Sequence, residues 1–259
     1  MGATTGDKTW QDGPWKTISG VENGAKNPQV GLQWLVNDMV VVHNVLIRSI
    51  NAIYLQCTNI SSPKDVSDFM EYCAEWGHVI HEHHTTEETD VFPGIENLAG
   101  EQGLMEKNVE QHHEFLPSLE KFIEYIQEVK SGKVQYDGQQ FKEMIESFMP
   151  AMHEHLVEEI PTLMTLKKYE DKVDWDKYWR KKSAEIMDKG KSDPTAMKVF
   201  LPFCLSGHDA TFENGVFNWP PMPWPVKMLF RYWFHPIHKD WWRFAPCNAS
   251  STPRVLPFA

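Results

Sequence analysis

The chain has 259 residues, of which 41 % are hydrophobic and 24 % are charged, a composition typical of a globular protein with a core of normal size. Its net charge of −11 argues against binding to nucleic acid or to an anionic membrane surface, because both select for basic patches. The first residues lack the apolar segment of a signal peptide, and no stretch approaches the apolar length of a membrane span, so we expect a cytoplasmic protein.

The predicted elements begin with an irregular N-terminal arm over residues 1–30, which are rich in Gly, Pro, Asn and Thr. From residue 31 onward, apolar residues recur every three or four positions, which is typical of amphipathic helices. Short polar or Gly- and Pro-containing breaks divide this region into four helical segments, at about 31–57, 65–91, 102–130 and 138–168. Four long helices with short connections predict an all-α, up-down-up-down four-helix bundle over residues 31–170.

Residues 171–259 differ from the bundle in composition. Seven of the eleven tryptophans lie after residue 170, and the segment 217–225 (FNWPPMPWP) alternates aromatic residues with prolines. So much aromatic surface is unfavourable when it is exposed to water. We therefore expect residues 171–259 to form an ordered, partly helical C-terminal extension that packs on the bundle.

Each of the four predicted helices carries a histidine within its apolar stripe. In the second and fourth helices a glutamate follows this histidine four residues later, so both side chains of each pair share one helix face. The candidate metal ligands defined in this way are His43, His83, Glu87, His112, His155 and Glu159.

A dry core does not hold this many ionisable groups unless something compensates them. Metal ions do so, and helical bundles build metal centres from inward-facing Glu and His side chains. Mixed imidazole and carboxylate ligands suit iron, manganese or zinc, whereas two metals bridged by two carboxylates suit iron best. We therefore predict a centre of two iron ions, with manganese or zinc as the less favoured alternatives.

Several other histidines lie close to the predicted ligands. The stripes that would contain His113 or His153 are interrupted by proline and glutamate, which are poor core residues, so we do not expect these two to bind metal. His84 forms a partial apolar stripe and remains an alternative to His83, which we prefer. Neighbouring histidines that are not ligands are expected to orient ligands or to lie on the surface. This group is His78, His81, His84, His113 and His153.

The order of these elements resembles that of the hemerythrin-like, or HHE, cation-binding family: His, then His-x-x-x-Glu, then His, then His-x-x-x-Glu, with one element on each helix. The local sequences fit as well, and the resemblance covers about residues 31–168. The segments that carry it are 43–48 (HNVLIR), 83–93 (HHTTEETDVFP), 111–115 (QHHEF) and 155–160 (HLVEEI). The Trp- and Pro-rich C-terminal region resembles a subgroup of the family that is familiar from fungi.

The resemblance implies a non-haem di-iron site with oxo or hydroxo bridges and carboxylate bridges. The chain departs from the respiratory hemerythrins, which present two histidines one turn apart on the third helix, because Asn108 lies one turn before His112 here. Those proteins also end in a more widely spaced His and Asp, where this chain has His155 and Glu159. One nitrogen ligand fewer would leave an open coordination position, which favours chemistry over reversible oxygen carriage.

These features favour an oxygen-activating di-iron oxidoreductase whose partners are O2 and a small, apolar organic substrate. A Trp-, Phe- and Pro-rich extension that covers the bundle could line a pocket for such a substrate. The alternative is a binding protein without turnover, which carries or senses O2 or NO or handles iron. A purely structural metal is the least favoured interpretation, because structural sites are usually sulfur-rich zinc sites and the four cysteines are scattered along the chain.

Overall fold

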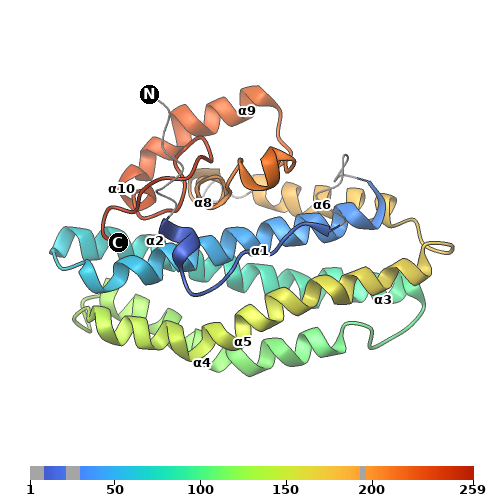
Figure 1. The fold of residues 1–259 in the computed structure, drawn as a ribbon, viewed down its shortest axis with the longest axis horizontal. Helices are drawn as coiled ribbons and strands as arrows, with labels where there is room; N and C mark the ends of the chain where they lie inside the picture. The colour runs from blue at the N-terminus through green and yellow to red at the C-terminus, as the bar shows by residue number, and fades with distance from the viewer. Residues whose placement is uncertain (1–8, 22–29, 193–196) are drawn as a thin grey trace.

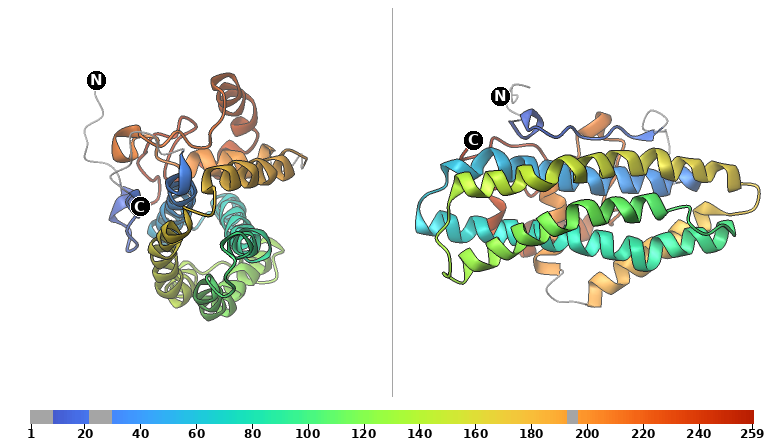
Figure 2. Two further views of the ribbon diagram at one scale, coloured as in Figure 1. Left: turned by 90° about the vertical axis from the view of Figure 1, so that its right-hand side faces the viewer. Right: turned by 90° about the horizontal axis from the view of Figure 1, so that it is seen from below.

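The computed structural model describes residues 9–21, 30–192 and 197–259, so the beginning of the predicted arm and residues 22–29 lie outside the described part. Four long antiparallel helices form a bundle, and no strand occurs among the described residues (Figures 1 and 2). The four helices are α1 (Gly31–Gln56), α2 (Pro63–Thr86), α4 (Glu106–Lys130) and α5 (Gly138–Met164). The predicted all-α bundle is confirmed.

The ends of the bundle helices follow from their local sequences. Ser62 caps α2 by accepting a hydrogen bond from the Asp65 amide at 3.2 Å, and Asp137 caps α5 by accepting from the amides of Gln139 and Gln140 at 2.8 and 3.0 Å. Such caps satisfy amides that have no partner within the helix. We expected the second helix to end near residue 91, but it continues through the π turn η4 (Glu87–Val91) into α3 (Phe92–Ala99).

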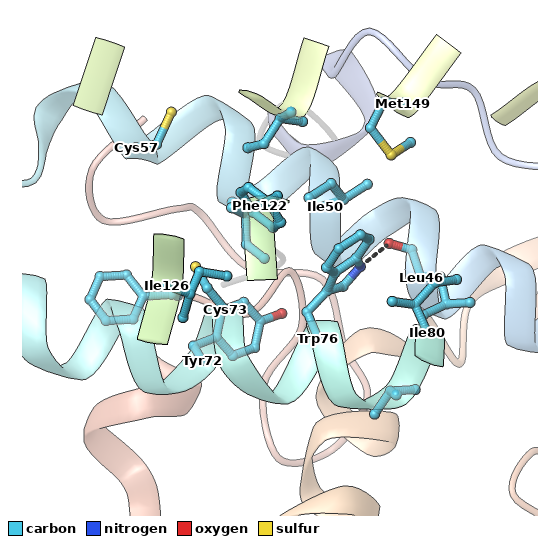
Figure 3. Packing of buried hydrophobic residues seen from close by; sticks show 14 of the residues in the cluster. Leu46, Ile50, Cys57, Tyr72, Cys73, Trp76, Ile80, Phe122, Ile126 and Met149 are labelled. Carbon is cyan, nitrogen blue, oxygen red and sulfur yellow. Dashed lines mark hydrogen bonds between the residues drawn. The ribbon is translucent and has the colours of Figure 1, made fainter. Parts of the chain in front are cut away.

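The bundle core is built from aromatic and aliphatic side chains of all four helices (Figure 3). The Trp76 ring on α2 lies 6.0 Å from those of Phe122 on α4 and Phe148 on α5, and its indole N–H donates a hydrogen bond to the carbonyl oxygen of Leu46 on α1 at 3.1 Å. One side chain thus joins four helices while its polar atom is satisfied. The four cysteines are buried and form no disulfide, as expected for scattered cysteines.

Helix α1 is more apolar than we expected from the sequence. With the following turn η3 (Cys57–Asn59) it has a window of mean hydropathy 1.2 and the length of a membrane span, so our expectation that no stretch approaches that length is wrong. However, 83 % of this window is buried inside the protein. The composition of α1 is therefore explained by its position, because it contacts α2 and α5 on one side and the extension on the other.

Residues 171–259 continue the fold as short helices that lie across α1 and α2 (Figure 1). Phe203, Trp242 and Phe244 are at most 1 % exposed and belong to the same apolar cluster as the bundle core, so the extension and the bundle share one core. The turn η5 (Thr165–Tyr169) follows α5 and precedes the extension. The elements of the extension are α6 (Trp175–Ser192), α8 (Phe200–Gly207), η6 (Phe212–Gly215), α9 (Trp224–Leu229), η7 (Phe230–Phe234), η8 (His235–His238) and α10 (Lys239–Trp242).

The described part of the N-terminal arm, which includes η1 (Thr9–Asp12), is held along α1 by two asparagines spaced two helical turns apart. The amide side chain of Asn44 accepts a hydrogen bond from Ile18 N at 2.7 Å and donates one to Ile18 O at 2.8 Å. Asn51 holds Trp15 in the same way, at 3.4 and 2.7 Å. These asparagines satisfy the backbone groups of an arm that has little regular structure of its own.

A buried histidine of the extension predicts a measurable loss of stability in acid. His208 is 2 % exposed, and its pKa is lowered to about 4 by burial and by the nearby charge of Arg48. An unfolded histidine has a pKa of about 6.5. The unfolded chain therefore binds the proton first, and the free energy of unfolding falls as the pH drops below about 6.5, by about 3 kcal/mol at pH 4.

Urea unfolding of the wild type and of His208→Asn at near-neutral and acidic pH measures this contribution. The variant should lose less stability than the wild type between the two conditions. An equal loss in both proteins would show that His208 does not titrate in this way.

Candidate metal centre

The bundle brings all six predicted ligands together in its interior. His43 comes from α1, His83 from α2, Glu87 from the start of η4, His112 from α4, and both His155 and Glu159 from α5. All are buried except His83, whose side chain is 10 % exposed. The predicted ligands fall into two pairs of imidazoles with two carboxylates between them.

The first pair consists of His43 and His83, whose Nε2 atoms lie 3.1 Å apart. Two nitrogens bound at about a right angle to one metal, each at about 2.1 Å, are about 3 Å apart. The Oε1 atom of Glu87 lies 3.1 Å from His83 Nε2, and the Oε2 atom of Glu159 lies 3.3 Å from His43 Nε2. These four side chains thus direct their donor atoms to one small volume.

The second pair consists of His112 and His155, whose Nε2 atoms lie 3.0 Å apart. The other oxygen of Glu87, Oε2, lies 3.6 Å from His112 Nε2. The Oε2 atom of Glu159 lies 3.9 Å from His155 Nε2. Each carboxylate therefore contacts both imidazole pairs, as expected of a carboxylate that bridges two metals.

The π turn η4 places two consecutive carboxylates against the same ring. Glu87 contacts Nε2 of His112, and Glu88 accepts a hydrogen bond from Nδ1 of that ring at 2.6 Å. In a regular α-helix neighbouring side chains point about 100° apart, whereas π turns alter this register and are frequent at functional sites. The two carboxylates of the turn thus fix the orientation of the His112 ring, because each contacts one of its nitrogens.

Contacts outside the pairs fix the orientation of three imidazoles. His43 Nδ1 donates to the carbonyl oxygen of Leu156 at 2.9 Å, and His155 Nδ1 lies 3.3 Å from the Oε1 atom of Gln111. With the bond from His112 to Glu88, each Nδ1 has an oxygen acceptor. Each Nε2 therefore keeps its lone pair and faces the interior of the site, the arrangement found in metal-binding histidines.

The electrostatics of the site favour a bound cation. All four carboxylate oxygens of Glu87 and Glu159 are buried without a hydrogen-bond donor. Burial, and then the charge of Glu159, raises the pKa of Glu87 well above its usual value, and burial lowers the pKa of His83 and of His155 well below theirs. Neutral imidazoles, and carboxylates that accept no hydrogen bond, have lone pairs without a partner. A metal cation bound between them would satisfy these lone pairs.

His84 also lies at the centre, although we preferred His83 on the basis of the sequence. The His84 ring is 7 % exposed and lies 4.2 Å from that of His112, and its Nε2 atom is buried without a hydrogen-bond partner. Donor atoms of His84, Glu87, His112 and His155 all lie within 4.8 Å of one another. The structure therefore brings both adjacent histidines to the site. The partial apolar stripe of His84 was the signal in the sequence.

The other histidines that were considered lie outside the centre. His78, His81 and His113 are exposed, and half-buried His153 contacts the carbonyl oxygen of Lys16 through Nε2 at 2.8 Å. Asn108, which lies one turn before His112, is 1 % exposed, and both polar atoms of its side chain are unpaired.

The four antiparallel helices and their buried His/Glu cluster define a helical-bundle protein with a cation-binding core. Residues 35–166 match the family model of the hemerythrin HHE cation binding domain. The chain belongs to this family, and its domain is one that binds metal cations.

The resemblance extends beyond the bundle in one relative, the dimeric xanthone biosynthesis cluster protein R11 of Cryptosporiopsis sp. (strain 8999). This relative is 33 % identical over 253 residues, which cover 97 % of this chain and 94 % of the relative, so the extension is shared as well. No solved structure matches the chain.

Proposed function

We propose that the chain holds two iron ions, one at each imidazole pair, and that it is an oxygen-activating oxidoreductase acting on a small organic molecule. The observation that carries this proposal is that Glu87 and Glu159 each contact both pairs. A donor set of imidazoles with two bridging carboxylates suits iron best among the common metals. When bound, iron supplies the redox chemistry by which such a site reacts with O2.

The residues of the chain hold the metals and shield the site from water. Nε2 of each paired histidine would bind iron, and the contacts at Nδ1 would keep the rings in place. Phe92 stacks on the His112 ring at 6.1 Å, and Phe115 lies 5.7 Å from the His155 ring. These apolar rings lower the polarity around the second pair and limit the entry of water.

We further propose that His84 is a third nitrogen ligand at the second pair. It lies beside His112, which is where a histidine at position 108 would be expected to lie. His84 would thus replace the third-helix histidine that this chain lacks. The second pair would then offer three imidazoles, whereas the first pair offers two. Positions for O2 or substrate would therefore be open beside His43 and His83. His83 is also the most exposed side chain of the site, at 10 %.

Replacing His84 by Ala tests this assignment. Loss of a ligand should weaken metal binding at the second pair by at least about a hundred-fold, so after dialysis against a chelator the iron content should fall from near two toward one per chain. His81→Ala is the matched control, because His81 is exposed on the same helix and should keep its iron. Full retention of iron in His84→Ala would exclude His84 as a ligand.

The substrate class is supported by the relative and by the extension. The name of the relative places it in a gene cluster for small-molecule biosynthesis, and the match covers 97 % of this chain. The extension adds aromatic residues that the bundle of a simple carrier does not need. Both observations support a tailoring enzyme that acts on an apolar organic molecule with O2 as co-substrate.

The second candidate is a protein that binds O2 or NO, or handles iron, without turnover. The close packing of Phe92 and Phe115 around the second pair favours a ligand as small as a diatomic gas. Oxygen-electrode and optical measurements on the reduced, iron-loaded protein separate the two functions. An enzyme should consume O2 continuously when a reductant is supplied, whereas a stable oxygenated spectrum that reverses under argon would contradict turnover and support a carrier.

A further inference from the structure

The helix formed by α9, η7 and η8 exposes several large apolar side chains. Of the nine large hydrophobic residues of the described chain that are clearly exposed, five lie on this helix. They are Trp224 (71 % exposed), Leu229 (47 %), Tyr232 (66 %), Trp233 (70 %) and Ile237 (48 %). We call this group of five side chains the aromatic ridge.

The aromatic ridge is not a poorly packed core face. The opposite side of the same helix already packs, because Phe230 is 1 % exposed and lies in a cluster with Leu205 and Met222. The helix is therefore apolar on its buried side and on its outer side. Its three exposed aromatic rings alone present on the order of 400 Å² to solvent, as much as the largest apolar patch of a typical monomer, and such patches mark interaction sites.

The shape of the ridge distinguishes between possible partners. The helix lies at the outer edge of the extension, on the side of the molecule away from α4 and α5 (Figures 1 and 2). A single projecting helix is a convex edge and suits insertion into a soft surface. A stable protein interface needs roughly 800 Å² of well-matched surface on each partner, which is about twice the area that the three exposed rings present.

The helix that carries the ridge has basic but no acidic side chains, unlike the chain as a whole. Residues 224–238 contain Lys227 and Arg231 and neither Asp nor Glu, although the chain carries a net charge of −11; Arg243, further along, is paired with Asp65 and Asp68 of α2. The guanidinium of Arg231 lies 5.2 Å from the centre of the Tyr232 ring, and Lys239 is exposed. A second copy docked ridge to ridge would bring these positive charges together, whereas an anionic surface would complement them.

We propose that the aromatic ridge docks the protein on membranes that contain anionic lipids. Tryptophan and tyrosine prefer the interface between lipid and water, and an amphipathic helix with flanking basic residues lies in that plane. The charge of −11 argued against an anionic membrane, but that argument used the average over the whole chain. The segregation of charge orients the molecule, because the acidic remainder is repelled while the ridge is attracted.

Sedimentation of the full, metal-loaded chain with vesicles tests this proposal. We expect binding to vesicles of equal parts phosphatidylcholine and phosphatidylserine, and weaker binding to phosphatidylcholine alone and at high salt. The double variant Trp224→Ser/Trp233→Ser should reduce binding by at least about a hundred-fold, because it removes the two largest apolar side chains that the membrane would bury. Arg231→Gln/Lys239→Gln should reduce it by about thirty-fold, as expected from the loss of two charges at the surface.

Leu98→Ser is the matched control, since Leu98 is 45 % exposed on α3, outside this helix, and this variant should bind like the wild type. Light scattering of the same proteins without lipid reports self-association. No binding to vesicles would overturn the proposal, and so would binding that the tryptophan variant retains. A dimer that only the tryptophan variant dissociates would also overturn it, because the ridge would then be a contact between copies.

Discussion

Replacing His83 or Glu159 by Ala is expected to remove most of the bound metal, whereas His113→Ala should keep it. His83 supplies one of only two nitrogens at the first pair, and Glu159 contacts both pairs, so each loss should weaken binding by at least about a hundred-fold. His113 is exposed on the same helix as His112. Metal content after gel filtration, with circular dichroism to verify folding, measures the effect.

Glu159→Gln is a useful conservative variant, because it preserves the volume of the side chain and one oxygen donor. It should retain more metal than Glu159→Ala if Glu159 is a ligand and not only a packing residue. Equal metal loss in the variants at His83, Glu159 and His113 would show that our assignment of the inward-facing positions is wrong.

Removal of the metal should lower the melting temperature strongly. A ligand present at a thousand times its dissociation constant stabilises the folded state by about 4 kcal/mol, which corresponds to about 8–16 °C for a chain of this size. The metal-free site adds to the loss, because the carboxylates of Glu87 and Glu159 then lie buried without donors. Thermal unfolding with and without a chelator, followed by re-addition of iron, measures the shift.

The stability of the metal-free protein should depend on pH in two opposite directions. The folded-state pKa of Glu87 is raised, so its contribution to stability is lost as the pH rises above about 4.5. The folded-state pKa values of His83 and His155 are lowered, so stability also falls as the pH drops below about 6.5.

A melting temperature that does not change on chelation would contradict a stabilising role for the metal. A shift in Glu159→Ala as large as that of the wild type would also contradict it, because this variant should hold little metal.

Helical periodicity was sufficient to predict the bundle and most of the site. A polar residue inside an apolar stripe of a long helix has only one direction in which to point, which is why His43, His112 and His155 could be assigned to the core from spacing alone. The four stripes converge because short loops force neighbouring helices to be antiparallel. The ligand assignment itself stays a prediction until metal binding is measured.

The region around His84 could not be predicted in the same way. His83 and His84 are adjacent residues of the regular helix α2, and adjacent side chains on a helix point about 100° apart. The spacing therefore forced a choice between them, whereas the structure brings both to the centre.

Helical periodicity also could not predict the path of the extension. Its aromatic content predicted burial, and Phe203 and Phe244 are indeed buried in the bundle core. Short helices interrupted by proline have no stripe long enough to show which face is covered, so the exposed ridge at Trp224 and Trp233 could not be foreseen. Since the extension completes the core, we expect truncation to destabilise the whole protein, so point variants are the appropriate test of its role.

The most direct test of a dinuclear centre is the iron content of protein purified from iron-supplemented cells, measured together with its optical spectrum before and after reduction. We expect near two irons per chain and near-ultraviolet absorption bands of an oxo-bridged iron pair that disappear on reduction. One iron per chain without those bands, zinc alone, or no metal at all would contradict the assignment of Glu87 and Glu159 as bridges between two irons.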